Sequence, residues 1–348
     1  MTVRIFDFLI RQLTWRQAMT TLVTGGAGYI GSHTVLSLLD AGEDVVVLDD
    51  LSTGFRWALP DGVELVVGDF GDEALISDIL QRRKVDSIIH FAAKIVVPES
   101  VADPLGYYLN NTAKARSLIA CAVRCSVKHF IFSSTAAVYG DPQQNPVTET
   151  ESLKPVSPYG RSKLMVEWML EDTARAHPIR YVVLRYFNVA GADPQMRSGQ
   201  SSANATHLIK VAVQAALGLR PGMEVFGTDY ETPDGSCVRD YIQVSDLAQA
   251  HLDALSHLRA GGDNLTCNSG YKRGFSVLEV IDVVKQVSGA DFPVTLSARR
   301  AGDPAAIVAS NETILSVLKW KPQYDDLQLI VRQALEWERK LQERSRNG

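Results

Sequence analysis

Tyr159 and Lys163 are the residues whose types and spacing point most directly to chemistry. They stand four positions apart in a helical pattern, so both side chains lie on one face of the helix. A free tyrosine, with a pKa near 10, is a poor base at neutral pH, but a neighbouring ammonium or a bound nicotinamide cation favours its phenolate. A hydroxyl from Thr135, or from Ser133 or Ser134, would complete a group that takes a proton from an alcohol or sugar hydroxyl. The Tyr-x-x-x-Lys spacing is weak evidence alone and depends on its context.

A glycine-rich turn near the N-terminus supplies that context. Gly25, Gly28 and Gly31 follow an apolar strand at residues 21–24 and open a helical run at residues 32–41. Such glycines allow a tight turn, the close approach of a pyrophosphate and close packing of the helix on the strand, while the helix N-terminus faces the phosphates. Glycine clusters usually mark ordinary turns, but this one has the strand, turn, helix and strand order of a dinucleotide-binding motif.

The second strand, at residues 44–48, is followed by Asp49 and Asp50. Asp49 stands about 20 residues beyond the glycines, where an acid accepts hydrogen bonds from the adenosine ribose. A carboxylate there would repel a 2′-phosphate, and the nearest arginine, Arg56, stands further along the chain, so the sequence predicts NAD rather than NADP as the cofactor. The alternative for Asp49 is a solvated acid at a strand end. Asp69, which ends the next strand, is a candidate adenine contact.

Strands and helices alternate along the first half of the chain. This order predicts right-handed βαβ crossovers and a doubly wound parallel sheet, an α/β fold of the Rossmann type. Further strands are expected at residues 63–67, 85–91, 129–134 and 180–186, and further helices at residues 72–84, 105–125 and 159–177. Ligand would lie at the carboxyl ends of the strands, where the sequence places Gly28, Asp49, Asp69, Ala92, Ser134 and Asn188.

In the second half of the chain we expect a smaller α/β lobe that closes over the substrate. The predicted division is a NAD-binding Rossmann domain at residues 19–188 and a mainly substrate-binding lobe at residues 189–348. Arg239, Arg299 and Arg300 are candidate phosphate clamps because arginine binds phosphate in a bidentate manner, and solvated surface arginines are the alternative. Helices are expected at residues 206–217, 244–258, 277–286 and 327–341, and strands at residues 224–226 and 238–242.

The bulk composition argues against several classes of function. The net charge of −5 and the lack of a basic stripe indicate that nucleic acid is not a partner. The four cysteines show no metal-binding spacing, which indicates reduced thiols in a cytoplasmic protein without a metal site. No stretch has transmembrane length or a signal-peptide pattern, so no membrane partner is expected. Residues 1–18 are interpreted as a leader, disordered or introduced by cloning, before a natural start at Met19; a short amphipathic anchor is the alternative.

Several longer motifs add a family resemblance to these arguments. They occupy residues 24–33, 90–93, 107–111, 132–140, 157–163, 184–188, 238–241 and 299–303. Through these motifs, residues 20 to about 343 resemble the UDP-glucose 4-epimerases of the extended short-chain dehydrogenase/reductase (SDR) family. The segments at residues 97–100 and 205–208 are similar to those of bacterial epimerases that supply exopolysaccharide synthesis.

The resemblance implies an isomerase that interconverts UDP-galactose and UDP-glucose through a transient 4-keto sugar, with NAD tightly bound. Tyr159 would take the proton from the sugar 4-hydroxyl while C4 passes hydride to NAD. Lys163 would hold the nicotinamide ribose and lower the pKa of the tyrosine, and Thr135 would hydrogen-bond the same 4-oxygen. The resemblance also implies a homodimer formed through the two long helices that begin near residues 105 and 159.

The same resemblance implies two sets of binding residues. The cofactor-binding residues are Gly25, Gly28, Tyr29, Ile30, Gly31, Asp49, Asp50, Asp69, Phe91, Ala92, Ala93, Asn110, Ser133, Tyr159, Lys163 and Phe187. The substrate-binding residues are Thr135, Tyr159, Asn188, His207, Val225, Phe226, Arg239, Arg300 and Asp303.

The chain departs from the family pattern at several positions. Thr135 stands where many relatives have serine, and the hydroxyl is kept. Lys94 stands one position before a lysine that is common near the pyrophosphate, where this chain has Ile95. His207 replaces a common asparagine. Ile307 stands near the sugar 2-substituent, at a position that is often bulky in relatives restricted to plain hexoses.

Other functions on the same fold are the alternatives. A nucleotide-sugar 4,6-dehydratase needs an Asp-Glu pair after the hydroxyl residue, whereas Ala136 and Ala137 follow Thr135 in this chain. A UDP-sugar decarboxylase is a further alternative. A non-catalytic NAD sensor of this fold often lacks the Tyr/Lys pair, which is intact here.

Overall fold

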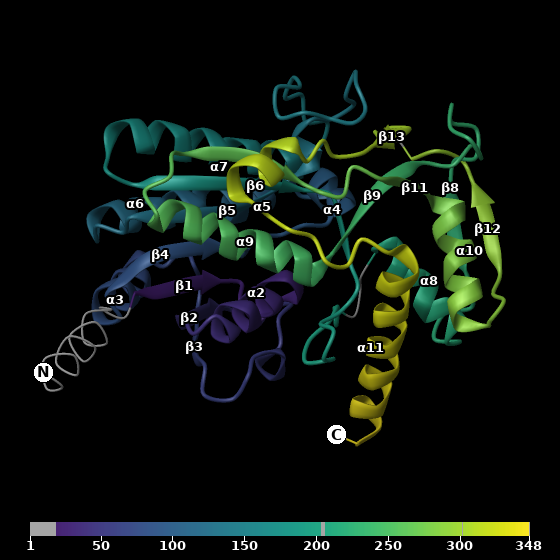
Figure 1. Ribbon diagram of the computed structural model, residues 1–348, viewed down its shortest axis with the longest axis horizontal. Helices are drawn as coiled ribbons and strands as arrows, with labels where there is room; N and C mark the ends of the chain where they lie inside the picture. The colour runs from purple at the N-terminus through teal and green to yellow at the C-terminus, as the bar shows by residue number, and fades with distance from the viewer. Residues whose placement is uncertain (1–18, 203–205, 301, 348) are drawn as a thin grey trace, which may run out of the picture.

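The computed structural model of the protein describes residues 19–202, 206–300 and 302–347, so the predicted leader at residues 1–18 lies outside the described residues. The largest element is a sheet of seven parallel strands in the order β10-β6-β5-β4-β1-β2-β3 (Figure 1). The order reverses between β1 and β4, which confirms the predicted doubly wound sheet and makes this the switch point where ligands of such folds bind. The strands are β1 (Thr20–Thr24), β2 (Asp44–Asp49), β3 (Glu64–Val67), β4 (Val85–His90), β5 (His129–Thr135), β6 (Arg180–Tyr186) and β10 (Leu265–Ser269).

Successive residues of the strands pack against helices on opposite faces of the sheet. Val23 and Ile131 belong to the apolar core on one face, and their neighbours Leu22 and Phe130 belong to the core on the other. Because both faces are buried, the strands read as continuous apolar runs in the sequence. Helices α2 (Tyr29–Asp40) and α9 (Val244–Arg259) cover the first face, and α3 (Glu73–Arg82), α6 (Lys114–Arg124) and α7 (Pro158–Ala176) cover the second.

The predicted long helix at residues 105–125 is wrong in one respect, because it is not one regular α-helix. Its middle is a π-helical turn, in which the Asn111 side chain accepts a hydrogen bond from Lys94 N and donates one to Lys94 O, both at 2.9 Å. A π-helical turn shifts the phase of the helix, so a pattern with a period of 3.6 residues does not reveal it. The segment consists of α5 (Pro104–Tyr107), the π-helical η2 (Tyr108–Ala113) and α6, and it is preceded by the unpredicted helix α4 (Val97–Ala102).

The second half of the chain forms the predicted smaller α/β lobe and also returns to the large sheet. Helix α9 and strand β10 pack with the first half, so residues 244–269 belong structurally with the large sheet, and the division at residue 188 stays a proposal about function. The lobe contains a four-stranded sheet, β7 (Asn188–Ala190), β9 (Val238–Gln243), β11 (Gly274–Ser276) and β13 (Ala306–Ile307), and the pair β8 (Met223–Phe226) and β12 (Val294–Ser297). Its helices are α8 (Leu208–Ala216), α10 (Val277–Ser288), α11 (Leu327–Asn347) and the short η4 (Ile314–Leu318), while η1 (Arg56–Ala58) and η3 (Ala136–Val138) lie in the first half.

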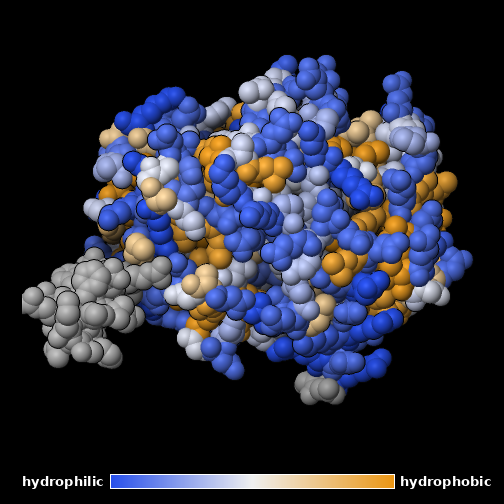
Figure 2. Space-filling view, viewed as in Figure 1, coloured by the Kyte–Doolittle hydropathy of each residue, from blue (hydrophilic) through white to orange (hydrophobic). Residues whose placement is uncertain are grey.

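The surface is mainly hydrophilic on the face shown in Figure 2. Apolar side chains gather there over β8, β12 and α10, at the side of the C-terminal lobe. In the described part of the chain, none of the helices combines the length and the apolar character needed to cross a bilayer.

Candidate active site

Helix α7 carries Tyr159 and Lys163 in its first two turns. Pro158 occupies the first turn, and Ser157 caps the helix by accepting a hydrogen bond from Gly160 N at 3.1 Å, so the sequence fixes the helix start just before Tyr159. Only 7% of Tyr159 and 2% of Lys163 is exposed. Lys163 Nζ donates a hydrogen bond to the backbone oxygen of a residue at the end of β5, Ser133 O, at 2.9 Å. The structure thus places the pair at the carboxyl end of the sheet.

The three hydroxyl residues that end β5 have different partners. Ser133 Oγ donates to the hydroxyl of a tyrosine on β6 at 2.7 Å, and Ser134 Oγ donates to the Glu167 carboxylate. The Thr135 hydroxyl hydrogen-bonds the Tyr159 phenol and thereby lowers the pKa of that phenol. Successive side chains of a strand point to opposite faces, so neighbouring hydroxyls cannot share one partner. Of the three alternatives in the sequence, the structure brings Thr135 to Tyr159.

The sequence predicts a lowered pKa for Tyr159, but burial has the opposite effect. Burial raises the pKa of Tyr159, and the hydrogen bond with Thr135 lowers it by less. Burial also lowers the pKa of Lys163 from its usual 10.5 to about 7, against the favourable charge of Glu167. A dry environment penalises phenolate and ammonium alike. The protein atoms alone therefore do not produce the predicted low tyrosine pKa.

The glycine-rich turn between β1 and α2 forms a cradle for an anion. Gly25 has a φ of +71°, and a Cβ there would stand 2.6 Å from Ala92 N. A Cβ at Gly31 would overlap Gly25 O. Gly28 caps α2 without a side-chain hydrogen bond, and the first turn of the helix contains no acidic residue. The N–H groups at this end of the helix thus donate no hydrogen bond to a capping side chain, which leaves them available for a phosphate group.

Asp49 stands beside this cradle at the end of β2. Its carboxylate accepts hydrogen bonds from Ala27 N at 2.9 Å and from Leu51 N at 2.8 Å, and only 7% of the residue is exposed. These bonds fix the carboxylate next to the glycine-rich turn, while each oxygen keeps a lone pair for a further donor. Together, the uncapped helix end, the glycines and this carboxylate fit the pyrophosphate and ribose of a dinucleotide.

Two other predicted cofactor acids are engaged in local contacts. Asp50 accepts a hydrogen bond from Ser52 N at 2.9 Å. Asp69 forms an ion pair with Lys114 on α6, with 2.6 Å between Nζ and Oδ2, and accepts a hydrogen bond from Gly71 N at 2.8 Å. A bond from adenine to the Asp69 carboxylate would therefore be shared with Lys114.

The remaining predicted cofactor residues come from four elements around the switch point. The Tyr29 phenol donates to Gly191 O at 2.8 Å, Phe91 packs against the ring of His251 with 4.7 Å between ring centroids, and Phe187 belongs to a small apolar cluster. The set comprises Tyr29 and Ile30 in the first turn of α2, Phe91, Ala92 and Ala93 after β4, Asn110 in η2, and Phe187 after β6.

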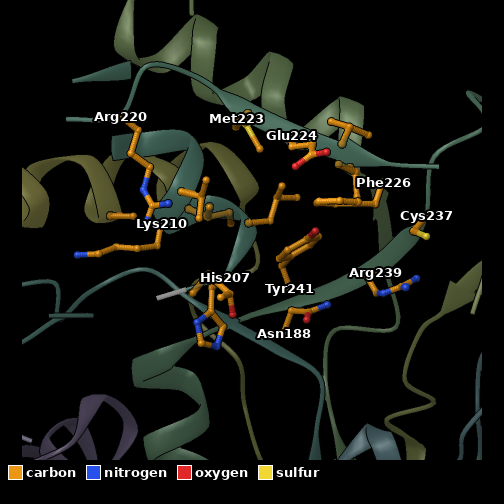
Figure 3. Close-up of a pocket in the computed structure, with 18 of the residues that line it drawn as sticks. Asn188, His207, Lys210, Arg220, Met223, Glu224, Phe226, Cys237, Arg239 and Tyr241 are labelled. Atoms are coloured by element: carbon orange, nitrogen blue, oxygen red, sulfur yellow. The ribbon is translucent and has the colours of Figure 1, made fainter. Parts of the chain in front are cut away.

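A cavity of about 860 Å³ lies between β7, β8, β9, α8 and α11. Figure 3 shows its polar side chains approaching from several of these elements. Thr135 and Tyr159 do not line the cavity. They are connected to it through β6, because Thr135 pairs with Tyr186 across the sheet, and Asn188, two residues after Tyr186, lines the cavity. The predicted substrate residues that line the cavity are Asn188, His207, Val225, Phe226, Arg239, Arg300 and Asp303.

The three candidate phosphate clamps separate in the structure. Arg239 and Arg300 line the cavity, and the Arg300 guanidinium lies 3.5 Å from the centroid of the Phe226 ring. Arg299 does not line it; instead its Nε forms an ion pair with Asp229 at 2.7 Å on an exposed surface. Of the three arginines, Arg299 is therefore the solvated surface residue and not a candidate phosphate clamp.

His207 lines the cavity as a neutral donor. Gln200 Nε2 lies 2.7 Å from His207 Nδ1, and burial lowers the pKa of the imidazole. Because the amide nitrogen is a donor, Nδ1 accepts and the ring proton is on Nε2. His207 thus directs a hydrogen-bond donor, Nε2, away from its contact with Gln200.

Sequence reasoning missed two large side chains of the cavity. Tyr241 lines it from β9, and its spacing of two from Arg239 in a strand was a usable signal, because such residues share a face. Trp337 lines it from α11, where its Nε1 donates to Ser201 Oγ at 3.2 Å. No local pattern predicts that second contact, because the two segments meet only in the folded chain. Within the described ranges, no three His, Cys, Asp or Glu side chains are grouped to hold a metal ion.

Comparison with known proteins agrees with this geometry. Residues 21–270 match the model of the NAD dependent epimerase/dehydratase family. A UDP-glucose 4-epimerase of Azospirillum brasilense is 54% identical over 322 residues, which cover 92% of each chain. The crystal structure of the UDP-glucose 4-epimerase from Brucella ovis in complex with NAD has a TM-score of 0.89 and 44% identity over 92% of this chain and 98% of that one. A UDP-glucose 4-epimerase structure from Stenotrophomonas maltophila, with bound NAD and formylated UDP-arabinopyranose, has a TM-score of 0.90 and 36% identity over 94% and 99%. This chain therefore belongs to the NAD dependent epimerase/dehydratase family.

Proposed function

We propose that this protein is a UDP-glucose 4-epimerase, an isomerase that interconverts UDP-galactose and UDP-glucose and keeps NAD bound throughout. The observation that carries the proposal is the convergence of two sites. The Tyr159, Lys163 and Thr135 cluster lies at the carboxyl end of β5, on the same edge of the sheet as a cradle that fits a dinucleotide, and the chain leads from there into a cavity lined by the predicted nucleotide-sugar residues. Relatives that match this chain over most of their length are named UDP-glucose 4-epimerases.

The protein side chains supply positioning and proton transfer. When bound, NAD supplies a reversible hydride acceptor for C4 of the sugar and the positive charge of its oxidised ring. Tyr159 removes the proton of the 4-hydroxyl, and Thr135 holds the same oxygen through a hydrogen bond. The Lys163 ammonium, together with the positive charge of the oxidised nicotinamide ring, would stabilise the phenolate against the cost of burial. Because a 4-keto sugar can turn about its link to the diphosphate, Tyr159 returns the proton after either face of the ketone has been reduced.

The cavity holds the part of the substrate that does not react. Arg239 and Arg300 would bind the diphosphate, and Asn188, His207 and Asp303 would hold the rest of the UDP portion with Val225 and Phe226. Fixing the nucleotide while the sugar turns converts binding energy into correct placement of C4. The alternative of a 4,6-dehydratase gains no support, because Ala136 and Ala137 form the short helix η3 directly after Thr135 and cannot move protons.

A homodimer is the second part of the proposal. Exposed apolar side chains gather on neighbouring helices: Leu105 is 77% exposed, Val101 65%, Leu109 60% and Trp168 52%. They belong to α4, α5, η2 and α7, which pack against one another. Exposed apolar side chains on helices that pack together support an interface with a second copy. Light scattering after gel filtration would show a dimer, and Leu105→Glu should convert it to a monomer.

The cellular context is also proposed. The described cysteines are free thiols, which supports a cytoplasmic protein. The motif resemblance supports a role in exopolysaccharide synthesis. Residues 19–188 would bind NAD and residues 189–348 mainly the nucleotide sugar, with α9 and β10 completing the large sheet.

The test is an assay of purified protein with UDP-galactose and no added NAD. We expect formation of UDP-glucose, because hydride and proton are both returned in each cycle. Tyr159→Phe should keep bound NAD and lose turnover by at least about 100-fold, the scale of a lost general base. Release of a 4-keto-6-deoxy sugar without UDP-glucose, or near-normal turnover of Tyr159→Phe, would contradict the proposal.

A further inference from the structure

Behind the Tyr159 and Lys163 face, three neighbouring strands place polar side chains in one row. The strand register aligns Ser134 on β5 with Arg185 on β6, and Arg185 with Asn268 on β10. All three residues are buried, with at most 5% exposed. A row of buried polar groups across three strands of a sheet is costly unless every group has a partner. The reaction described above uses none of these side chains.

Glu167 on α7 completes the row from the helix side. It stands one helical turn after Lys163 and is 6% exposed. Its carboxylate accepts hydrogen bonds from Ser134 Oγ and from Arg185, with 3.1 Å from Nε to Oε1 and 2.5 Å from Nη2 to Oε2. Tyr159, Lys163 and Glu167 therefore form one buried stripe at a spacing of four residues.

The network continues beyond Arg185 and leaves none of these groups unpaired. Arg185 Nη1 donates to Tyr139 OH at 3.1 Å, and Tyr139 OH donates to Asn268 Oδ1 at 2.6 Å. Asn268 Nδ2 in turn donates to Val147 O at 2.9 Å. A buried ion pair usually contributes little net stability, because removing both charges from water costs as much as their attraction returns. Stability alone is thus a weak reason for this arrangement.

Two consecutive residues of β5 join this network to the active site. The backbone oxygen of Ser133 accepts a hydrogen bond from the Lys163 ammonium at 2.9 Å, and the hydroxyl of Ser134 donates one to the Glu167 carboxylate. Glu167 and Lys163 are thereby held at fixed positions on both the helix and the strand. We propose that Glu167 and Arg185 are positioning residues of the reaction: Glu167 keeps Lys163 in place as an ammonium, and Arg185 sets how strongly Glu167 does so. This inference rests on the role proposed for Lys163.

The other titratable groups around Lys163 do not replace Glu167. The charge of Glu167 raises the pKa of Lys163 against the dominant effect of burial. His90 on β4 is neutral, because burial and the nearby Lys163 lower its pKa to about 3. Burial raises the pKa of Tyr186 on β6 and of Tyr159 on α7, so both are neutral phenols in this state. Among these neighbours, Glu167 is the one that carries negative charge.

The charges of Glu167 and Arg185 are opposite, so removing each should shift the pKa of Lys163 in the opposite direction. In Glu167→Gln, Lys163 loses an attractive charge and Arg185 is left uncompensated nearby, so Lys163 gives up its proton at lower pH. In Arg185→Met, the Glu167 charge is no longer balanced, so Lys163 keeps its proton to higher pH. We expect each shift to be about 1 pH unit, the lower end of the effect of a nearby charge. The double variant Glu167→Gln/Arg185→Met should return close to the wild-type value, because a neutral pair replaces an ion pair.

The experiment measures two quantities in the NAD-containing protein. The first is the pH dependence of turnover with UDP-galactose, in which activity falls at alkaline pH as Lys163 loses its proton. The second is the titration of the Lys163 side chain by NMR of 13C-labelled lysine, with the signal assigned by its loss in Lys163→Met. Glu171→Gln, which removes an exposed carboxylate one turn further along α7, is the control and should leave both titrations unchanged.

Each result decides the question. Opposite shifts in the single variants, with near cancellation in the double variant, support the inference. Equal shifts, or reduced turnover without any shift, would show a purely structural role and overturn it. If the single variants do not fold, a double variant that folds but titrates 1 pH unit away from wild type also overturns it. Absent epimerisation in the wild type, together with the expected NMR shifts, would refute the proposed function and leave the positioning role of Glu167 intact.

Discussion

Replacing Lys163 with methionine should make the protein more stable below pH 7 while it abolishes turnover. Lys163 is 2% exposed, and burial lowers its pKa from 10.5 to about 7. A shift of this size corresponds to about 5 kcal/mol for holding the charged form in the folded state. Methionine keeps the length and apolar stem of the side chain without the charge. It loses the hydrogen bond to Ser133 O, which contributes about 1 kcal/mol, so the net gain is about 4 kcal/mol at most.

The pH dependence of this gain has a definite sign. The folded pKa of Lys163 lies below the unfolded one, so the unfolded chain binds more protons between about pH 7 and pH 10.5. The stability of the wild type therefore rises with pH across this window, and the burial cost is fully present below it. The advantage of Lys163→Met should be largest below pH 7 and should disappear as the pH approaches 10.5.

Urea unfolding of nucleotide-free protein at pH 6 and pH 9 is the assay, since a bound nucleotide would add its own stabilisation. Lys210→Met is the matched control, because Lys210 is also buried but forms an ion pair with Glu338, and both residues are 6% exposed or less. Removing one partner of a buried pair costs about 3–5 kcal/mol, so this variant should be less stable. If Lys163→Met is also destabilised at pH 6, the burial argument for the active-site ammonium is refuted.

Three further predictions concern the cofactor, the nucleotide and the sugar. Gly31→Ala should purify with less NAD, because the added Cβ would overlap Gly25 O and open the cradle; full NAD content, measured by absorbance after denaturation, would contradict this. Arg239→Met should raise the KM for UDP-galactose by about tenfold or more, because a charged hydrogen bond contributes at least about 1.5 kcal/mol, whereas Arg299→Met should change it little; equal effects would refute the assignment. Ile307 is 7% exposed in a small apolar cluster, and if it leaves room for the 2-substituent, UDP-N-acetylglucosamine should be a substrate. Ile307→Tyr should then lower activity on this sugar more than on UDP-galactose. Equal losses on the two sugars would argue against a role of Ile307 in accepting the 2-substituent.

The strand and helix pattern of the first half was predictable because each element is amphipathic or apolar over its own length. The π-helical turn was not, because Asn111 adopts it to hold the loop at Lys94, a contact that no periodic pattern contains. The start of α2 at Tyr29, rather than at residue 32, also follows from tertiary packing. Gly31 is a poor helix former in isolation, but only a glycine fits against Gly25 O.

The alternating fold, the dinucleotide fingerprint, and the types and spacing of Tyr159 and Lys163 could be predicted from local sequence, because they are properties of residues close together in the chain. The folded chain was needed to select Thr135 among three hydroxyls and to separate Arg239 and Arg300 from Arg299. It also revealed that the protein alone raises the pKa of the phenol. The physical reason is common to these outcomes: exposure, hydrogen-bond partners and local dielectric depend on segments that meet only when the chain is folded.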